Sequence, residues 1–121
     1  MIIGIGTDII EISRVRQAVG REIFKQKVFS AAEQNYCESR GKQKYSSYAA
    51  RFAAKEAFFK ALGTGIFSRP ADVEIVNDER GRPEIFLHGK VAAQAKLLGV
   101  EKISVSLSHS HNFATAVCIV E

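Results

Sequence analysis

Two acidic residues stand where an acid is unusual. Asp8 lies near the end of an isoleucine-rich N-terminal run whose length and composition predict a buried strand. Glu56 comes four residues after Phe52 and three before Phe59, so helical spacing puts all three on one face. A carboxylate that faces a core is unfavourable unless it is paired or binds a cation. Together the two acids offer the oxygen ligands that suit Mg²⁺, which takes one or two carboxylates beside water and phosphate oxygens.

Each acid also has a simpler interpretation. Asp8 could be a turn or helix-capping aspartate. Glu56 could form a surface pair with Lys60, one helical turn further along. The run from Gly4 to Asp8 begins like a dinucleotide-binding fingerprint, but Ile9 stands where the third glycine belongs, which argues against a Rossmann fold.

Cations and glycines follow Glu56 at the end of the same predicted helix. Lys55, Lys60 and the run Gly63-Thr64-Gly65 combine positive charge with backbone amides that can approach a phosphate closely. The lysines precede the glycines, so this is not a Walker loop, and the glycines also fit an ordinary helix C-cap. Carboxylates, cations and amides together are the groups that phosphoryl transfer needs, because its catalysis is largely positioning and charge neutralisation.

The segment 106–111, Ser-Leu-Ser-His-Ser-His, is dense in hydroxyl and imidazole groups. It could contact a phosphate or nucleotide, or form a simple polar turn. A metal site built on His109 and His111 would need further ligands, which the sequence does not offer. A serine–histidine hydrolase is disfavoured because no G-x-S-x-G elbow accompanies the pair.

Length and composition predict one globular domain over residues 1–121. The chain has 46% hydrophobic and 25% charged residues, and no apolar run approaches the length of a membrane span. The N-terminus lacks the basic region of a signal peptide, so we expect a cytoplasmic protein. Cys37 and Cys118 are far apart and in no metal-type spacing, so we expect two reduced thiols.

A net charge of +4 and an isoelectric point near 9.2 predict an acidic partner. Charge alone does not decide among a nucleic acid, an acidic protein and a polyphosphate. Basic residues crowd the N-terminal part of the chain: Arg14, Arg21, Lys25, Lys42 and Lys44. Arg14 and Arg21 are seven residues apart, so we expect their side chains to point the same way if the chain continues helically past Gly20.

The order of elements predicts an α+β fold, with one strand, several helices and then mainly antiparallel strands. The expected strands cover 2–10, a hairpin containing Val73, Ile75 and 84–87, and the pair 102–108 and 113–120. The expected helices cover 14–19, capped by Ser13, then 21–27, Ser30 to Gly41, 44–62 and 89–98. The last strand is apolar at nearly every position, so both its faces need cover, which suggests a subunit interface.

Three blocks resemble the holo-acyl-carrier-protein synthase family of short, single-unit 4′-phosphopantetheinyl transferases. They are Gly-Thr-Asp-Ile-Ile-Glu over 6–11, FAAKEAFFKALGTG over 52–65 and SLSHSHNFATA over 106–116. The blocks occur in order across essentially the whole chain. The resemblance implies the family's fold and its reaction, the transfer of phosphopantetheine from coenzyme A to a serine of an apo acyl carrier protein, with release of adenosine 3′,5′-bisphosphate.

The resemblance also implies residue roles. Asp8 and Glu56 would hold Mg²⁺, and Lys60 would act with them. Lys60, Gly63 and His109 would bind coenzyme A, while Arg14 and Arg21 would receive the acidic carrier protein. The family forms homotrimers with sites between subunits. Whether Glu56 also helps to deprotonate the serine, through a bound water, stays open.

Two other functions remain as alternatives. A non-catalytic basic module that binds RNA or an acidic protein would explain the positive charge, but not a glutamate within an apolar stripe. Its aromatic residues also cluster at 45–59 with helical spacing, which indicates a core rather than a base-stacking surface. A metal-dependent phosphohydrolase could use the same carboxylates on another phosphate.

Overall fold

The computed structural model describes residues 1–121 and has the α+β order that the sequence predicts. The strands are β1 (Gly4–Glu11), β2 (Val73–Asn77), β3 (Pro83–Leu87), β4 (Ile103–His109) and β5 (Phe113–Val120). The helices are α1 (Ile12–Val19), α2 (Glu22–Val28), α3 (Ala31–Glu38), α4 (Lys44–Leu62) and α5 (Gly89–Leu97), with 3-10 turns η1 (Gly41–Gln43) and η2 (Pro70–Asp72). None of these helices has the length and apolarity that crossing a membrane requires.

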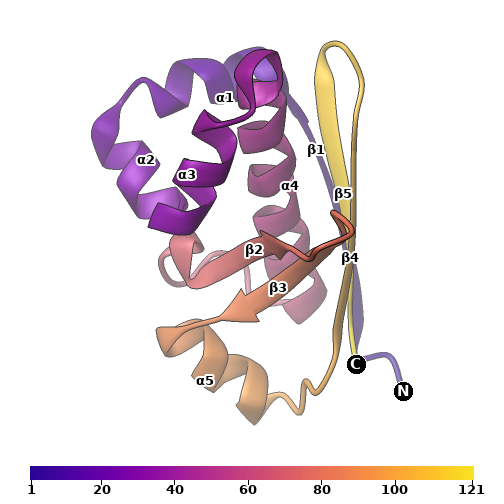
Figure 1. Ribbon diagram of the computed structural model, residues 1–121. Helices are drawn as coiled ribbons and strands as arrows, with labels where there is room; N and C mark the ends of the chain where they lie inside the picture. Colours follow the sequence, from indigo (N-terminus) through magenta and orange to yellow (C-terminus); the bar gives the residue numbers. More distant parts are fainter.

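The strands form two antiparallel sheets. The larger has the order β1-β5-β4, so the first strand of the chain pairs with the last. The smaller is the predicted hairpin of β2 and β3, whose second strand lies against β4. Figure 1 shows α4 along one face of the larger sheet, with α1, α2 and α3 on the side of α4 away from that sheet. Helix α5 lies at the lower end of the molecule, the end at which both chain termini lie.

Helix α4 is the centre of the molecule and has the limits that the sequence predicts. It packs against all three strands of the larger sheet on one side and against α1, α3 and β2 on the other. Thirteen of its 19 residues are buried, so a single apolar stripe was too narrow an expectation. The helix ends at Gly63, whose φ of 78° is the left-handed conformation that favours glycine.

Two helix ends differ from the expectation. Ser13 does not cap α1, because the helix already begins at Ile12 and its N-cap is Glu11, without a side-chain bond. The helix that begins after Ser30 stops at Glu38 rather than at Gly41. The Ser30–Glu33 capping box at its start is confirmed, since Glu33 N–H donates to Ser30 Oγ and Ser30 N–H donates to Glu33 Oε1.

The two faces of the larger sheet differ sharply. On the face toward α4, β5 presents Ala114, Ala116, Cys118 and Val120, all buried. The opposite face is bare and largely apolar. Its exposed side chains include Ile5 (65%), Ile9 (67%), Phe113 (44%) and Val117 (37%). Within one chain, β5 therefore has the predicted cover on one face only.

Both cysteines are buried and free of disulfide bonds. Burial is the largest cause that raises the pKa of each thiol, to about 12 for Cys37 and about 12 for Cys118. A thiol with so high a pKa is protonated and unreactive near neutral pH. The two cysteines therefore act as small apolar core residues.

Candidate active site

The pattern Gly-x-Gly-x-Asp in β1 brings this strand unusually close to α4. Alternate residues of a strand face the same side, so Gly4, Gly6 and Asp8 all face the helix. A Cβ atom at Gly6 would overlap the carbonyl oxygen of Ala57, and one at Gly4 would overlap that of Ala61. The glycines thus permit a close approach of the two backbones, and the next residue toward α4 is Asp8.

Asp8 meets residues of α4 at the end of this contact. Lys60 Nζ donates to Asp8 Oδ1 over 3.2 Å and to the carbonyl oxygen of Thr7 over 3.0 Å. Glu56 lies one helical turn before Lys60 and is half-buried. The structure therefore brings Asp8 together with Glu56 and Lys60, which lie far from it in the sequence.

The two carboxylates affect one another. Burial is the largest cause that raises the pKa of Glu56, the negative charge of Asp8 raises it further, and Lys60 lowers it. An acid whose pKa is raised by burial and a like charge is typical of functional sites. The site therefore favours an added positive charge.

Lys55 does not belong to this cluster, contrary to the expectation from its place beside Glu56. Its side chain is 1% exposed and its ammonium group donates to Glu33 Oε1 and to the carbonyl oxygens of Pro70 and Val73. All three of its donors are thus used inside the core. Lys55 joins α3, α4 and β2 and is not available to a phosphate.

Arg14 and Arg21 line one groove, but not through a continuous helix, because α1 ends at Val19 and Arg21 is the extended N-cap of α2. The groove has a volume of about 540 Å³, and its lining also includes Ile10, Gln17, Phe24 and Phe52. Ile10 is two residues from Asp8 on the same face of β1, and Phe52 is one turn before Glu56 on α4. The groove therefore lies next to the carboxylates, which do not themselves line it, and it combines two exposed arginines with apolar side chains.

Gly63 serves the ordinary capping function that the sequence left open. Its N–H donates to the carbonyl oxygens of Phe59 and Lys60, so this amide is already used. The amides of Thr64 and Gly65 donate to no group of the chain. Any amide contribution of this loop to a phosphate therefore comes from the two residues after Gly63.

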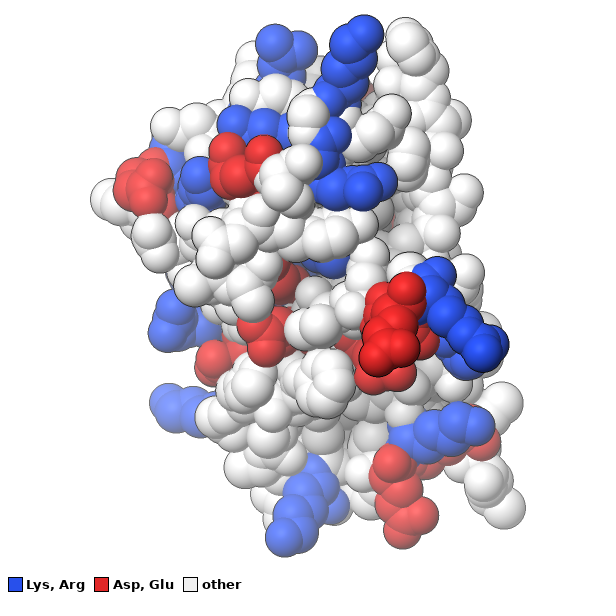
Figure 2. Space-filling view, viewed as in Figure 1, with Lys and Arg blue, Asp and Glu red and all other residues white.

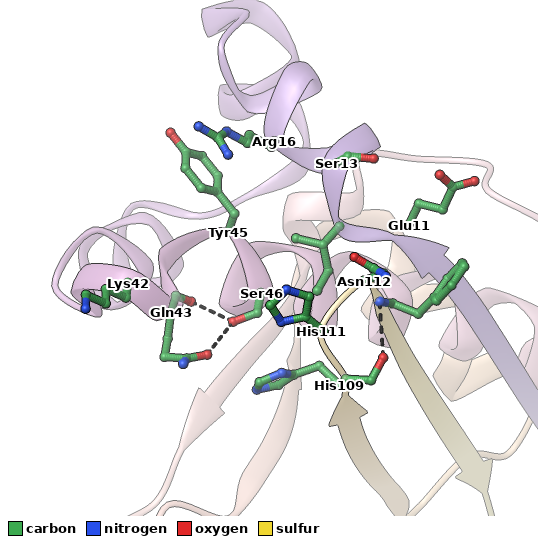
Figure 3. Close-up of a pocket in the computed structure, with 13 residues that line it drawn as sticks. Glu11, Ser13, Arg16, Lys42, Gln43, Tyr45, Ser46, His109, His111 and Asn112 are labelled. Atoms are coloured by element: carbon green, nitrogen blue, oxygen red, sulfur yellow. Dashed lines mark hydrogen bonds between the residues drawn. The ribbon is translucent and has the colours of Figure 1, made fainter.

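His109 lies in a different cavity, of about 790 Å³, at the turn between β4 and β5. Figure 3 shows its imidazole near Gln43 and Ser46, with His111 and Arg16 around the same opening. Ser46 Oγ donates to the carbonyl oxygen of Gln43, which fixes this wall at the start of α4. The polar turn of the sequence is therefore part of a wide polar cavity.

Within one chain, His109 does not share its cavity with Lys60 or Gly63. Its cavity includes Ser46, near the start of α4, whereas Gly63 follows the last residue of that helix. Ser46 and Lys60 are 14 residues apart on α4, which corresponds to about 21 Å. The three residues that the family resemblance assigns to coenzyme A therefore do not line one cavity in a single copy.

Sequence reasoning missed most of the wall of the second cavity. Glu11, Arg16 and Tyr45 line it together with the polar turn and with Lys42, one of the basic residues that the sequence singles out. The one available signal was the density of basic residues in the N-terminal part. Figure 2 shows Lys and Arg side chains gathered over the upper part of the molecule, where Figure 1 places α1, α2 and α3.

Comparison with known proteins identifies the class to which this fold and site belong. Residues 4–118 match the model of the 4′-phosphopantetheinyl transferase superfamily. A holo-[acyl-carrier-protein] synthase of Ruminiclostridium cellulolyticum is 48% identical over 120 residues, which cover 96% of this chain and 90% of that protein. The chain therefore belongs to the 4′-phosphopantetheinyl transferase superfamily, and the resemblance found in the sequence is confirmed.

Solved structures give the same result for the fold. The holo-[acyl-carrier-protein] synthase of Neisseria meningitidis superposes with a TM-score of 0.91 at 31% identity, over 100% of this chain and 99% of that one. A Helicobacter pylori holo-[acyl-carrier-protein] synthase in complex with coenzyme A superposes with a TM-score of 0.83 at 32% identity, over 97% of this chain and 99% of that one. The predicted phosphopantetheinyl-transferase fold is thus confirmed.

Proposed function

We propose that this chain transfers the 4′-phosphopantetheine group from coenzyme A to a serine of an apo acyl carrier protein, at a site formed by Asp8, Glu56 and Lys60. The observation that carries the proposal is the meeting of these three residues beside the groove that Arg14 and Arg21 line. The chain is a phosphopantetheinyl transferase by family, and coenzyme A is the ligand of its Helicobacter pylori relative.

The residues of the site fit a magnesium ion. Asp8 and Glu56 supply carboxylate oxygens, and burial together with the negative charge of Asp8 raises the pKa of Glu56. No group of three or more histidine, cysteine or acidic side chains gathers anywhere in the molecule, so an ion here would have only these two carboxylates as such ligands. Mg²⁺ commonly uses only one or two protein carboxylates and leaves its other positions to water and phosphate. When bound, it would offset charge on the pyrophosphate of coenzyme A.

Transfer requires an exchange of bonds at one phosphorus atom. The serine oxygen forms a bond to the β-phosphorus of coenzyme A, and the bond from that phosphorus to the bridging oxygen breaks. Adenosine 3′,5′-bisphosphate leaves with the bridging oxygen, and the serine proton passes to a base, for which Glu56 is the candidate. Lys60 contributes positive charge at the transferring phosphate.

The groove of Arg14 and Arg21 is the surface we assign to the carrier protein. Acidic side chains of the carrier would meet the arginines at the rim, and complementary charge sets encounter rate and orientation. Apolar side chains would contact Phe24 and Phe52 on the floor. A carrier held in this groove has its serine beside Asp8 and Glu56.

We further propose that the working form is a homotrimer with sites between subunits. Two observations support an assembly: the bare apolar face of the larger sheet, and the separation of His109 from Lys60 within one chain. A neighbouring copy that covers the sheet could bring its His109 cavity to the carboxylates of the first. Sedimentation equilibrium should give a trimer at micromolar concentration, and a fully active monomer would contradict the assembly.

The activity is tested by weighing the carrier. Purified protein, coenzyme A, Mg²⁺ and an apo acyl carrier protein are mixed, and the intact mass of the carrier is measured. We expect a gain of one phosphopantetheine. Release of free phosphopantetheine with an unmodified carrier would indicate a phosphohydrolase instead. No reaction, with retained binding of the carrier, would favour a non-catalytic binding module.

A further inference from the structure

The ammonium group of Lys60 is hydrogen-bonded to Asp8 Oδ1, a carboxylate oxygen that a bound divalent cation would also use. Its ammonium nitrogen lies 3.2 Å from Asp8 Oδ1 and 3.0 Å from the carbonyl oxygen of Thr7. An ammonium group has three donors, so these bonds leave one donor unused. The Lys60 side chain is 55% exposed and that of Asp8 is 15% exposed. The lysine therefore reaches a mostly buried carboxylate from the solvent side.

The charges of the cluster show what this contact does. Asp8 and Glu56 together carry two negative charges when ionised, and Lys60 returns one positive charge. A cation bound to Asp8 would lie a few ångströms from the ammonium group, where the repulsion between like charges is strong. The ammonium group and a bound divalent cation therefore compete for Asp8.

Lys60 is also free to move. A lysine side chain has a flexible four-carbon stem and a compact charge. More than half of this side chain is exposed, and no third acceptor holds its ammonium group. Leaving Asp8 thus breaks only two hydrogen bonds of the ammonium group, which water can replace.

We propose that Lys60 is an exchangeable counter-ion. It neutralises Asp8 while the carboxylates hold no divalent cation, and it is released toward the substrate phosphates when the cation takes Asp8 Oδ1. The inference rests on the proposed assignment of Asp8 and Glu56 as metal ligands. It adds that cation binding and phosphate binding are coupled through one side chain, because the displaced ammonium group becomes available to coenzyme A. Such a coupling is reciprocal between the two ligands.

The coupling is tested with Mn²⁺, whose binding is followed by the loss of the free-ion signal in electron paramagnetic resonance, without substrate. We expect Lys60→Met to bind Mn²⁺ on the order of tenfold more tightly than the wild type, since a competing unit charge is removed. Lys96→Met is the matched control, because it removes the same charge from an exposed position on α5. Its affinity for Mn²⁺ should equal that of the wild type.

The second readout is the affinity for coenzyme A with and without Mn²⁺. In the wild type, Mn²⁺ should tighten coenzyme A binding, and in Lys60→Met this gain should shrink. Unchanged or weaker Mn²⁺ binding by Lys60→Met would overturn the inference, even where the wild type binds Mn²⁺ through Asp8. If Asp8→Asn binds Mn²⁺ as well as the wild type does, the metal assignment itself fails, and the role of Lys60 as its counter-ion fails with it.

Discussion

Two lysines of helix α4, Lys55 and Lys60, each pair with a carboxylate from another element. The two pairs differ in distance, burial and hydrogen bonding. Lys55 and Glu33 are 2.7 Å apart, with side chains 1% and 0% exposed. Lys60 and Asp8 are 3.2 Å apart, with side chains 55% and 15% exposed. The first pair lies between α3, α4 and β2, and the second lies where α4 meets β1 at the end of a groove.

Hydrogen bonding separates the two pairs further. Lys55 uses all three donors, and Glu33 also accepts from the N–H groups of Ser30 and Ile75. The pair at Asp8 has no such enclosure, and beside it Glu56 holds a second carboxylate with a raised pKa. A lysine–carboxylate pair that is closed on all sides stabilises the fold. One that is exposed and unbalanced in charge can exchange its partner for a ligand.

The largest expected effect concerns the exposed pair and its neighbour. Asp8→Ala and Glu56→Ala should each reduce transfer by about a thousandfold or more, since charge stabilisation at the reacting phosphate supplies much of the rate. Both variants should keep the wild-type circular dichroism spectrum. The rate is measured from the mass of the carrier over time. Near-native turnover of either variant at ordinary Mg²⁺ would show that the metal ligands lie elsewhere.

The buried pair should respond in stability instead. Lys55→Met leaves Glu33 buried without its partner, and breaking a buried ion pair on one side costs about 3–5 kcal/mol. Lys60→Met, which removes an exposed lysine, should change the free energy of unfolding by less than about 1 kcal/mol. Urea denaturation measures both. Equal losses of unfolding free energy in the two variants would contradict the distinction between a structural and a functional lysine.

The sequence could predict much of the fold because the signals there are local. The capping box at Ser30, the left-handed cap at Gly63 and the apolar run of β5 each depend on neighbouring residues. The wrong helix ends at Ser13 and Gly41 have the opposite origin. Helix α1 begins directly after β1, one residue before Ser13, and α3 ends at Glu38 with Ser39 as its C-cap, before the chain reaches Gly41.

The candidate site was predictable only in part. Asp8 and Glu56 were found because an acid in an apolar setting is anomalous whatever the topology. Lys55 was wrongly expected at a phosphate site, because no local pattern shows that Glu33, 22 residues earlier, is buried and binds it in the core. The walls of the His109 cavity come from both ends of the chain and the start of α4, so only the pairing of β1 with β5 brings them together.

A smaller effect is expected at the groove next to the exposed pair. Arg14→Glu and Arg21→Glu should each raise the KM for the carrier protein about tenfold and leave that for coenzyme A nearly unchanged. The wild-type rate at low carrier concentration should fall as salt rises, because exposed charges are screened over about 8–10 Å. Arg80→Glu, in the β2–β3 turn, is the matched control. Equal damage to coenzyme A binding would mean that one surface serves both substrates.

The smallest effect is a pH-dependent gain in stability. The pKa of Glu56 is raised in the folded protein, so the folded state keeps this proton at pH values where the unfolded state has released it. Ionised Glu56 therefore destabilises the fold at neutral pH, and this effect disappears below the ordinary pKa. Glu56→Gln should melt at or above the wild-type temperature at pH 7 without metal. At pH 4 the difference should vanish, and a destabilised variant at pH 7 would contradict the burial of this carboxylate.

The most direct measurement mixes two inactive variants. If Asp8 of one copy works with His109 of a neighbour, Asp8→Ala and His109→Ala are each inactive, yet their mixed assemblies contain some sites with both residues intact. Unfolding the two proteins together and refolding them should therefore restore transfer to the carrier, while each variant refolded alone stays inactive. A mixture as inactive as its components, despite confirmed mixed assemblies, would contradict a site shared between copies.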